Sequence, residues 1–151
     1  MKLLFENWQR FINEGITITT SSPQTINTRQ EIVDYITNNP DQEIYLDNPK
    51  GSAKAFGANE KTRLPVDYGE WPHLINPADN MGWDLIIVPS ATKDDAHLIP
   101  VGHLAYSNVR PEKLGNDKII IAPEGNYSQN DREIIEDFFS QLGSFEAVEW
   151  Y

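Results

Sequence analysis

The run Trp-Asp-Leu-Ile-Ile-Val at residues 83–88 decides the fold that we expect for this chain. It is short, almost entirely apolar and rich in isoleucine and valine, and Pro89 ends it. A short apolar run closed by proline is typical of a buried β-strand. A second run of the same kind, Asp-Lys-Ile-Ile-Ile-Ala at residues 117–122, is ended by Pro123. The two runs therefore predict two buried strands.

Shorter segments predict the remaining strands. Residues 43–47 and residues 98–106 have strand-like composition, and Gly102 within the second segment is typical of a β-bulge. Residues 147–151 predict a final short strand. By contrast, the stretch from Asn48 to Trp71 is rich in Gly, Pro, Lys and Asn, which indicates mostly loop.

The first capping signal lies near residue 30. Thr28 and Glu31 have the spacing of a capping box, which marks the start of a helix. The segment that follows carries Ile32 and Ile36 at helical spacing. We expect this helix to stop before Pro40, because the residue before a proline disfavours helical backbone.

Two further helices are expected near the chain ends. Ser128 begins a capping sequence, and the apolar face of the helix that follows runs to Leu142, with Gly143 suited to the position after its end. Residues 1–14 predict a short amphipathic helix, and residues 16–19 alternate like a strand. The N-terminal stripe is either packed on the body of the protein or serves as an interaction surface.

These elements indicate two parts within one chain. Residues 1–40 are expected to form an N-terminal helix-strand-helix extension, and residues 41–151 the main body. Short strands separated by long polar loops, with helices beside them, predict an α+β fold built on a small barrel or a curled sheet.

Composition narrows the classes of function. The chain has 151 residues, a formal net charge of −11 and no cysteine, which excludes disulfides, thiolate metal sites and thiol catalysis. The negative charge argues against binding nucleic acid or an anionic membrane by bulk attraction. The sequence holds no apolar run long enough to span a bilayer and no secretory leader, so we expect a cytoplasmic protein. Assembly into a homo-oligomer is left open.

The first stretch with chemical potential is Asp47-Asn48-Pro49-Lys50-Gly51-Ser52, with Lys54 just beyond it. A strand delivers an acid to a glycine turn, and two lysines follow. Backbone N–H groups and lysines at such a turn can hold phosphate oxygens. The alternative is an ordinary surface turn, since residues of this kind are common in turns.

The second stretch links Asp79, in a loop rich in Pro and Gly, to Asp84 at the start of the apolar strand. Two carboxylates so placed can bracket one divalent cation, and Mg²⁺ needs only one or two protein carboxylates. The alternative is that Asp79 makes an Asx-turn and Asp84 is a solvated charge at a strand end.

The third stretch, Gly115-Asn116-Asp117-Lys118, places an acid and a base at the start of the second buried strand. The alternative is a β-turn with a surface ion pair of little energetic consequence.

In this order, the stretches resemble the soluble, Mg²⁺-dependent family I inorganic pyrophosphatases, and most of all the short versions carried by phage-like genomes. The pieces that carry the resemblance are Asn48–Ser52, Pro65–Gly69, the Asp79–Asp84 loop with the strand after it, Pro100–Leu104 and Asn116–Ile121. The resemblance implies a five-stranded OB-like β-barrel with flanking helices and an active site at the barrel mouth. It also implies attack of water on pyrophosphate, or on another small phosphate compound, assisted by Mg²⁺.

The resemblance and the three stretches together assign roles to nine residues. Metal binding falls to Asp47, Asp79, Asp84 and Asp117; catalysis to Asp79, Asp84 and Tyr68; and substrate binding to Lys50, Lys54, Arg63 and Lys118.

The chain also departs from the family pattern. The family's middle acid, which helps to activate water, falls on Met81, an acidic pair falls on Asn108 and Val109, and a further acid falls on Asn116. Methionine does not bind a hard cation, and asparagine offers a neutral oxygen in place of a charge. Three hypotheses therefore remain: a pyrophosphatase-like hydrolase, a degenerate relative that binds a phosphate ligand or a protein partner without turnover, and an interaction protein.

Overall fold

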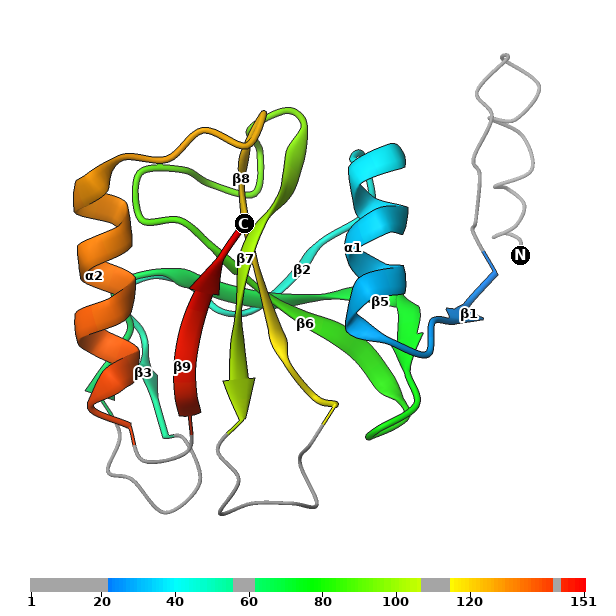
Figure 1. The fold of residues 1–151 in the computed structure, drawn as a ribbon, viewed down its shortest axis with the longest axis horizontal. Helices are drawn as coiled ribbons and strands as arrows, with labels where there is room; N and C mark the ends of the chain where they lie inside the picture. The colour runs from blue at the N-terminus through cyan, green and yellow to red at the C-terminus, as the bar shows by residue number, and fades with distance from the viewer. Residues whose placement is uncertain (1–21, 56–61, 107–114, 143–144) are drawn as a thin grey trace, which may run out of the picture.

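A computed structural model describes residues 22–55, 62–106, 115–142 and 145–151. The helix predicted for residues 1–14 and the strand predicted for residues 16–19 lie outside the described residues. The elements run in the order shown in Figure 1: β1 (Gln24–Thr25), α1 (Arg29–Asn38), β2 (Tyr45–Asn48), β3 (Ala53–Lys54), β4 (Thr62–Arg63), β5 (Asp67–Asn76), β6 (Met81–Ile87), β7 (Leu98–Tyr106), β8 (Lys118–Pro123), α2 (Gln129–Ser140) and β9 (Phe145–Trp150).

The two apolar runs form neighbouring strands at the heart of the main sheet. Its strand order is β1-β5-β6-β8-β7-β9, with β2 paired to β5 as well, and β3 and β4 form a separate two-stranded sheet. β6 and β8 are parallel, with Leu85 opposite Ile119 and Ile87 opposite Ile121. All four of these side chains are fully buried, which explains why both strands lack the polar alternation of a half-exposed strand.

The mixture of helices with a strand-rich core is confirmed, but the five-stranded OB-like barrel is not. The main sheet has seven strands and stays open in the described part of the chain. Its last strand, β9, pairs with β7 alone, and β1 and β2 lie at the other end on β5. In the described residues the architecture is therefore an open, mixed seven-stranded sheet.

Strand β5 is the main element that the sequence did not predict, because its first five residues fall within the stretch expected to be mostly loop. Two residues that are uncommon in strands, a proline and a glycine, explain why β5 was not recognised. Pro72 lies where the β5–β6 register shifts, between Trp71 and Ile75, so its missing N–H removes no regular ladder bond. Gly69 lies where a Cβ atom would come within 2.3 Å of the Tyr45 carbonyl oxygen, so only glycine allows β2 to approach β5 this closely.

Both described helices begin at the predicted caps. The Thr28 hydroxyl accepts a hydrogen bond from the backbone N–H of Glu31, and Ser128 makes a complete capping box with Asp131. α1 buries Ile32 and Ile36 in the same hydrophobic core as the strands, so this part of residues 1–40 packs into the body. The bulge predicted at Gly102 is present, since the β7–β8 register shifts there.

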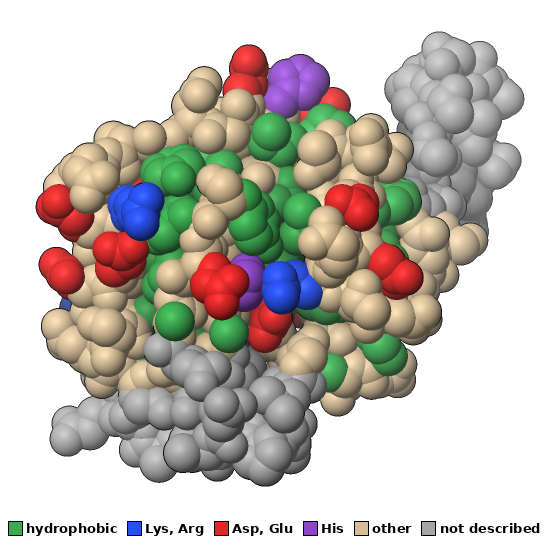
Figure 2. Space-filling view, in the orientation of Figure 1, with side chains coloured by type: hydrophobic (Ala, Val, Ile, Leu, Met, Phe, Trp, Pro, Cys, Tyr) green, Lys and Arg blue, Asp and Glu red, His purple; other side chains and the backbone are tan. Residues whose placement is uncertain are grey.

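A pocket lies beside α2. It lies between α2, β7 and β9, has a volume of about 190 Å³, and includes Leu104, Phe139 and Val148 in its walls. In Figure 2, hydrophobic side chains are visible over the middle of this face, with charged side chains between them. Among the described residues, the pocket lining contains Glu136 and no basic residue, which makes it unsuited to a phosphate group.

None of the described helices combines the length and the apolar character needed to cross a membrane.

Candidate metal and phosphate site

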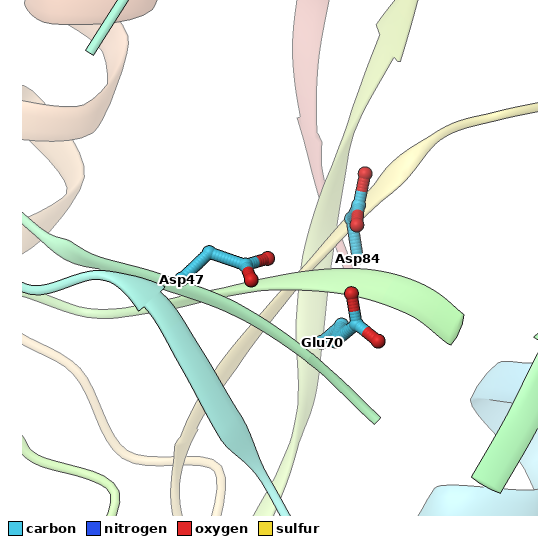
Figure 3. A group of neighbouring side chains, drawn as sticks. All are labelled: Asp47, Glu70 and Asp84. Carbon is cyan, nitrogen blue, oxygen red and sulfur yellow. The ribbon is translucent and has the colours of Figure 1, made fainter. Parts of the chain in front are cut away.

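Three carboxylates from three neighbouring strands converge on one face of the sheet. Asp47 of β2, Glu70 of β5 and Asp84 of β6 each offer one oxygen, and these oxygens all lie within 4.8 Å of one another (Figure 3). We call these three residues the acidic trio. Glu70 and Asp84 are directly opposite in the antiparallel β5–β6 pair, so they share a face. Asp47 joins them from the point where the β2–β5 register shifts, between Leu46 and Asn48.

Gly82 leaves the space that the Glu70 carboxylate occupies. A Cβ atom at position 82 would lie 2.8 Å from Glu70 Oε2 and 2.5 Å from the carbonyl oxygen of Trp71. Any side chain at this position would therefore push the Glu70 carboxylate or strand β5 away from β6. Glycine here allows two strands to present their acids side by side.

Asp84 is held by two further residues from the same face. The Lys118 ammonium forms an ion pair with Asp84 Oδ2, and the Tyr68 hydroxyl donates to the same oxygen over 3.3 Å. Lys118 is only 3% exposed. Because β6 and β8 are parallel and in register at Leu85 and Ile119, the residues just before them lie next to each other. The pairing of β6 with β8 thus brings Lys118, from the third sequence stretch, to Asp84, from the second.

Lys54 completes this group. Its ammonium nitrogen lies 4.6 Å from the centroid of the Tyr68 ring, in the geometry of a cation–π contact. Tyr68 therefore contacts Lys54 through its ring and Asp84 through its hydroxyl. Tyr68, which makes both contacts, lies on β5, the strand that the sequence did not predict.

The electrostatics of the acidic trio disfavour three bare charges. Burial, followed by the negative charge of Asp84, raises the pKa of Asp47, although Lys54 partly opposes this. Burial raises the pKa of Glu70 too, and the charges of Asp47, Asp84 and Asp79 add to the effect. Like charges held this close favour the uptake of a proton or of a cation.

The structure does not bring two of the predicted metal ligands into the trio. Asp79 Oδ1 accepts a hydrogen bond of 3.0 Å from the backbone N–H of Met81, which is the Asx-turn alternative, although Asp79 is near enough to influence Glu70. Asp117 pairs with Arg29 of α1 at 3.1 Å, so its charge is engaged elsewhere.

The glycine turn of the first stretch is internally bonded. The backbone N–H groups of Lys50, Gly51 and Ser52 donate to Asp67, Leu64 and Pro49, which leaves none of the three for a phosphate oxygen. The Lys50 ammonium donates to the Pro89 carbonyl at 2.7 Å, and Arg63 donates to the Gly51 carbonyl at 2.7 Å. The side chains of Lys50 and Arg63 therefore stabilise loops, whereas Lys54 and Lys118 lie at the acidic trio.

Glu70 is the site residue that sequence reasoning missed. It lies two residues after Tyr68, so a strand reading of this stretch would have placed both on one face. Interpreting residues 48–71 as loop removed that signal.

The structure describes two of the residues at which the chain departs from the family pattern, Met81 and Asn116. Met81 is 59% exposed, whereas Asn116 is buried and lies 3.5 Å from the Asn76 amide nitrogen. Asn108 lies outside the described residues.

Comparison with known proteins leaves the function to be argued from this site. No protein-family model matches the chain, and no curated protein matches it. Among solved structures, the chain is similar to the crystal structure of an inorganic pyrophosphatase from Ehrlichia chaffeensis. The two share 17% sequence identity with a TM-score of 0.41, over 72% of this chain and 82% of the other.

Proposed function

We propose that this chain hydrolyses a phosphoanhydride bond with the help of Mg²⁺, in the manner of an inorganic pyrophosphatase. The observation that carries the proposal is the acidic trio, with its three oxygens within 4.8 Å of one another and Lys118 paired to Asp84. The proposal takes the chain as a short, phage-like relative of that family that acts in the cytoplasm.

The donor set fits magnesium. All three ligand atoms are carboxylate oxygens, which Mg²⁺ prefers over nitrogen or sulfur, and no histidine joins them among the described residues. Asp47 is exposed, so the site is open to water molecules that would complete the coordination of the cation. Burial is the main cause of the raised pKa values of Asp47 and Glu70, and the charges of neighbouring acids add to it. A cation would offset the second of these causes, the repulsion between the carboxylates.

Each residue then has a distinct part. Asp47, Glu70 and Asp84 would hold the cation, which when bound neutralises phosphate oxygens and makes water more acidic. Lys54 and Lys118 would place positive charge beside the phosphate groups. Tyr68 orients the Asp84 carboxylate through its hydrogen bond.

A second candidate function, binding of a phosphate compound without turnover, is favoured by Met81. This residue stands where the resemblance places the family's middle acid, and its side chain is 59% exposed. Without that acid, no fourth carboxylate joins the acidic trio among the described residues.

Phosphate release from pyrophosphate, measured with and without Mg²⁺, separates the two functions. We expect Mg²⁺-dependent release that falls by about 100-fold or more in Asp84→Asn and Glu70→Gln, since even outer-shell partners of metal sites cost about 10–100-fold. Asp94→Asn is the matched control, because this acid is 83% exposed in a loop and pairs with Lys93. Wild-type protein that releases no phosphate above background would end the hydrolase proposal. A rise in melting temperature with Mg²⁺ and methylenediphosphonate would then support the binding function.

A further inference from the structure

Tyr45 is an exposed aromatic residue next to the acidic trio. Its side chain is 60% exposed, more than any other large hydrophobic residue in the described part of the chain. No hydrogen bond or ring contact of its side chain occurs among the described residues. The aromatic residues of neighbouring strands behave differently, since Tyr68, Trp71 and Trp83 are all buried.

The strand register puts Tyr45 on the face of the trio. Tyr45 is opposite Glu70 in the antiparallel β2–β5 pair, and residues opposite each other project from the same face. Asp47 follows two residues later on the same strand, about 6–7 Å further along it. The ring thus emerges beside two of the three carboxylates.

Strand β2 also leaves this side of the site open. Within the described residues it pairs with β5 alone, so no further strand covers Tyr45 from its other edge. In the described part of the chain, the edge of β2 that faces away from β5 therefore carries no further strand.

We propose that Tyr45 stacks on the base of a nucleotide whose phosphates are held at the acidic trio, so that the substrate class is a nucleoside di- or triphosphate. This inference rests on the proposed function and narrows it. Every base has an aromatic face, so stacking on tyrosine favours nucleotides as a class over bare pyrophosphate.

Stacking would compensate for what the site lacks. The trio offers three carboxylates, and Met81 stands where the resemblance expects the family's middle acid. The site would therefore hold fewer metal ions beside a highly charged phosphate group. Binding energy from a part of the substrate that does not react can be used at the reacting centre. A base on Tyr45 would provide such a contribution.

The test compares two hydrolysis-resistant probes that differ only in the nucleoside. Isothermal titration calorimetry with Mg²⁺ measures the Kd of α,β-methylene-ADP and of methylenediphosphonate for the wild type and for Tyr45→Ala. We expect the wild type to bind α,β-methylene-ADP more tightly. The Tyr45→Ala variant should lose about 5- to 150-fold in affinity for this probe and stay within about twofold for methylenediphosphonate.

Two further variants keep the test sharp. Tyr45→Phe should retain the affinity of the wild type, because the ring and not the hydroxyl makes the contact. Tyr151→Ala removes a similarly exposed tyrosine, whose hydroxyl meets His103 on the opposite face from Lys118, and should leave both affinities unchanged.

The outcomes separate this inference from the proposed function. An unchanged Kd for α,β-methylene-ADP in Tyr45→Ala, equal losses for both probes, or no wild-type preference for the nucleotide would each overturn the inference. If such a result accompanied Mg²⁺-dependent hydrolysis of pyrophosphate, the proposed function would stand without it. Conversely, selective loss of the nucleotide probe in Tyr45→Ala supports the base-stacking site even if the wild type hydrolyses neither pyrophosphate nor ADP.

Discussion

Asp131 and the acidic trio are carboxylates whose surroundings act on them in opposite ways. Asp131, at the start of α2, is only 1% exposed, and its oxygens accept hydrogen bonds from the Ser90 backbone N–H at 3.0 Å, the Ser90 hydroxyl at 2.7 Å and the Ser128 backbone N–H at 3.0 Å. Burial alone raises the pKa of Asp131, but the hydrogen bonds from Ser128 and Ser90 outweigh burial and lower it. In the acidic trio, burial and like charges raise the pKa of Glu70 and Asp47.

The difference separates a structural acid from acids suited to a ligand. Every donor around Asp131 belongs to the protein, so its charge is already satisfied and stabilises the folded state. The trio contains more negative charge than its protein partners neutralise, which is typical of a site that awaits a cation. The following predictions test this contrast.

The largest effect is expected at Asp131. Asp131→Ala removes the acceptor of three donors, on Ser90 and Ser128, and with it part of the cap of α2. Because hydrogen bonds to a charged group and helix caps both contribute to stability, the free energy of unfolding should fall by about 3 kcal/mol. Urea denaturation followed by circular dichroism measures the change. Asp137→Ala is the control, because this acid is exposed on the same helix. A loss as small as that of the control would show that Asp131 is not the structural acid that its hydrogen bonds indicate.

Lys118 should have the next largest effect. Lys118→Met removes the buried partner of Asp84, and breaking such a pair should cost about 2 kcal/mol of stability, less than for a fully buried pair because Asp84 remains 18% exposed. Denaturation without metal measures the loss, and adding Mg²⁺ should restore part of it. Lys93→Met, at a lysine that is 45% exposed, is the control. Equal losses with and without Mg²⁺ would contradict a cation site beside Asp84.

The central strands could be predicted from the sequence because they are buried on both faces. Residues 83–88 and 117–122 are nearly continuous apolar runs, and β6 and β8 follow them closely. Their parallel pairing could not be predicted, since an apolar run carries no information about its neighbour. The caps at Thr28 and Ser128 were predictable because they depend on local hydrogen bonds alone.

Only part of the candidate site could be predicted from the sequence. Asp47, Asp84, Lys54, Tyr68 and Lys118 were singled out and do converge. Asp117 does not join them, because its charge pairs with Arg29 from a helix whose position no local pattern reveals. Glu70 was missed because its strand was not recognised.

The smallest effect concerns the pH dependence of stability at Glu70. The folded protein holds the Glu70 proton more tightly than the unfolded chain does, because the pKa is raised in the fold. This contribution to stability is therefore complete below the ordinary glutamate pKa of 4.5 and is lost as the pH rises through the raised value. Glu70→Gln cannot ionise, so without metal it should become more stable than the wild type at neutral pH, by less than about 1 kcal/mol.

Thermal denaturation without metal, from below the ordinary glutamate pKa to neutral pH, measures the difference in stability between the wild type and Glu70→Gln. Glu133→Gln, at an exposed glutamate of α2, is the control and should follow the wild type. The direction of the pH dependence distinguishes the two kinds of acid. Asp131 has a lowered pKa, so it stabilises the fold at pH values above the ordinary aspartate pKa and loses this contribution as the pH falls. A Glu70→Gln variant that is less stable than the wild type at neutral pH would mean that Glu70 is satisfied by the protein as Asp131 is. The contrast between the two groups of acids, and with it the case for a cation at the trio, would then fail.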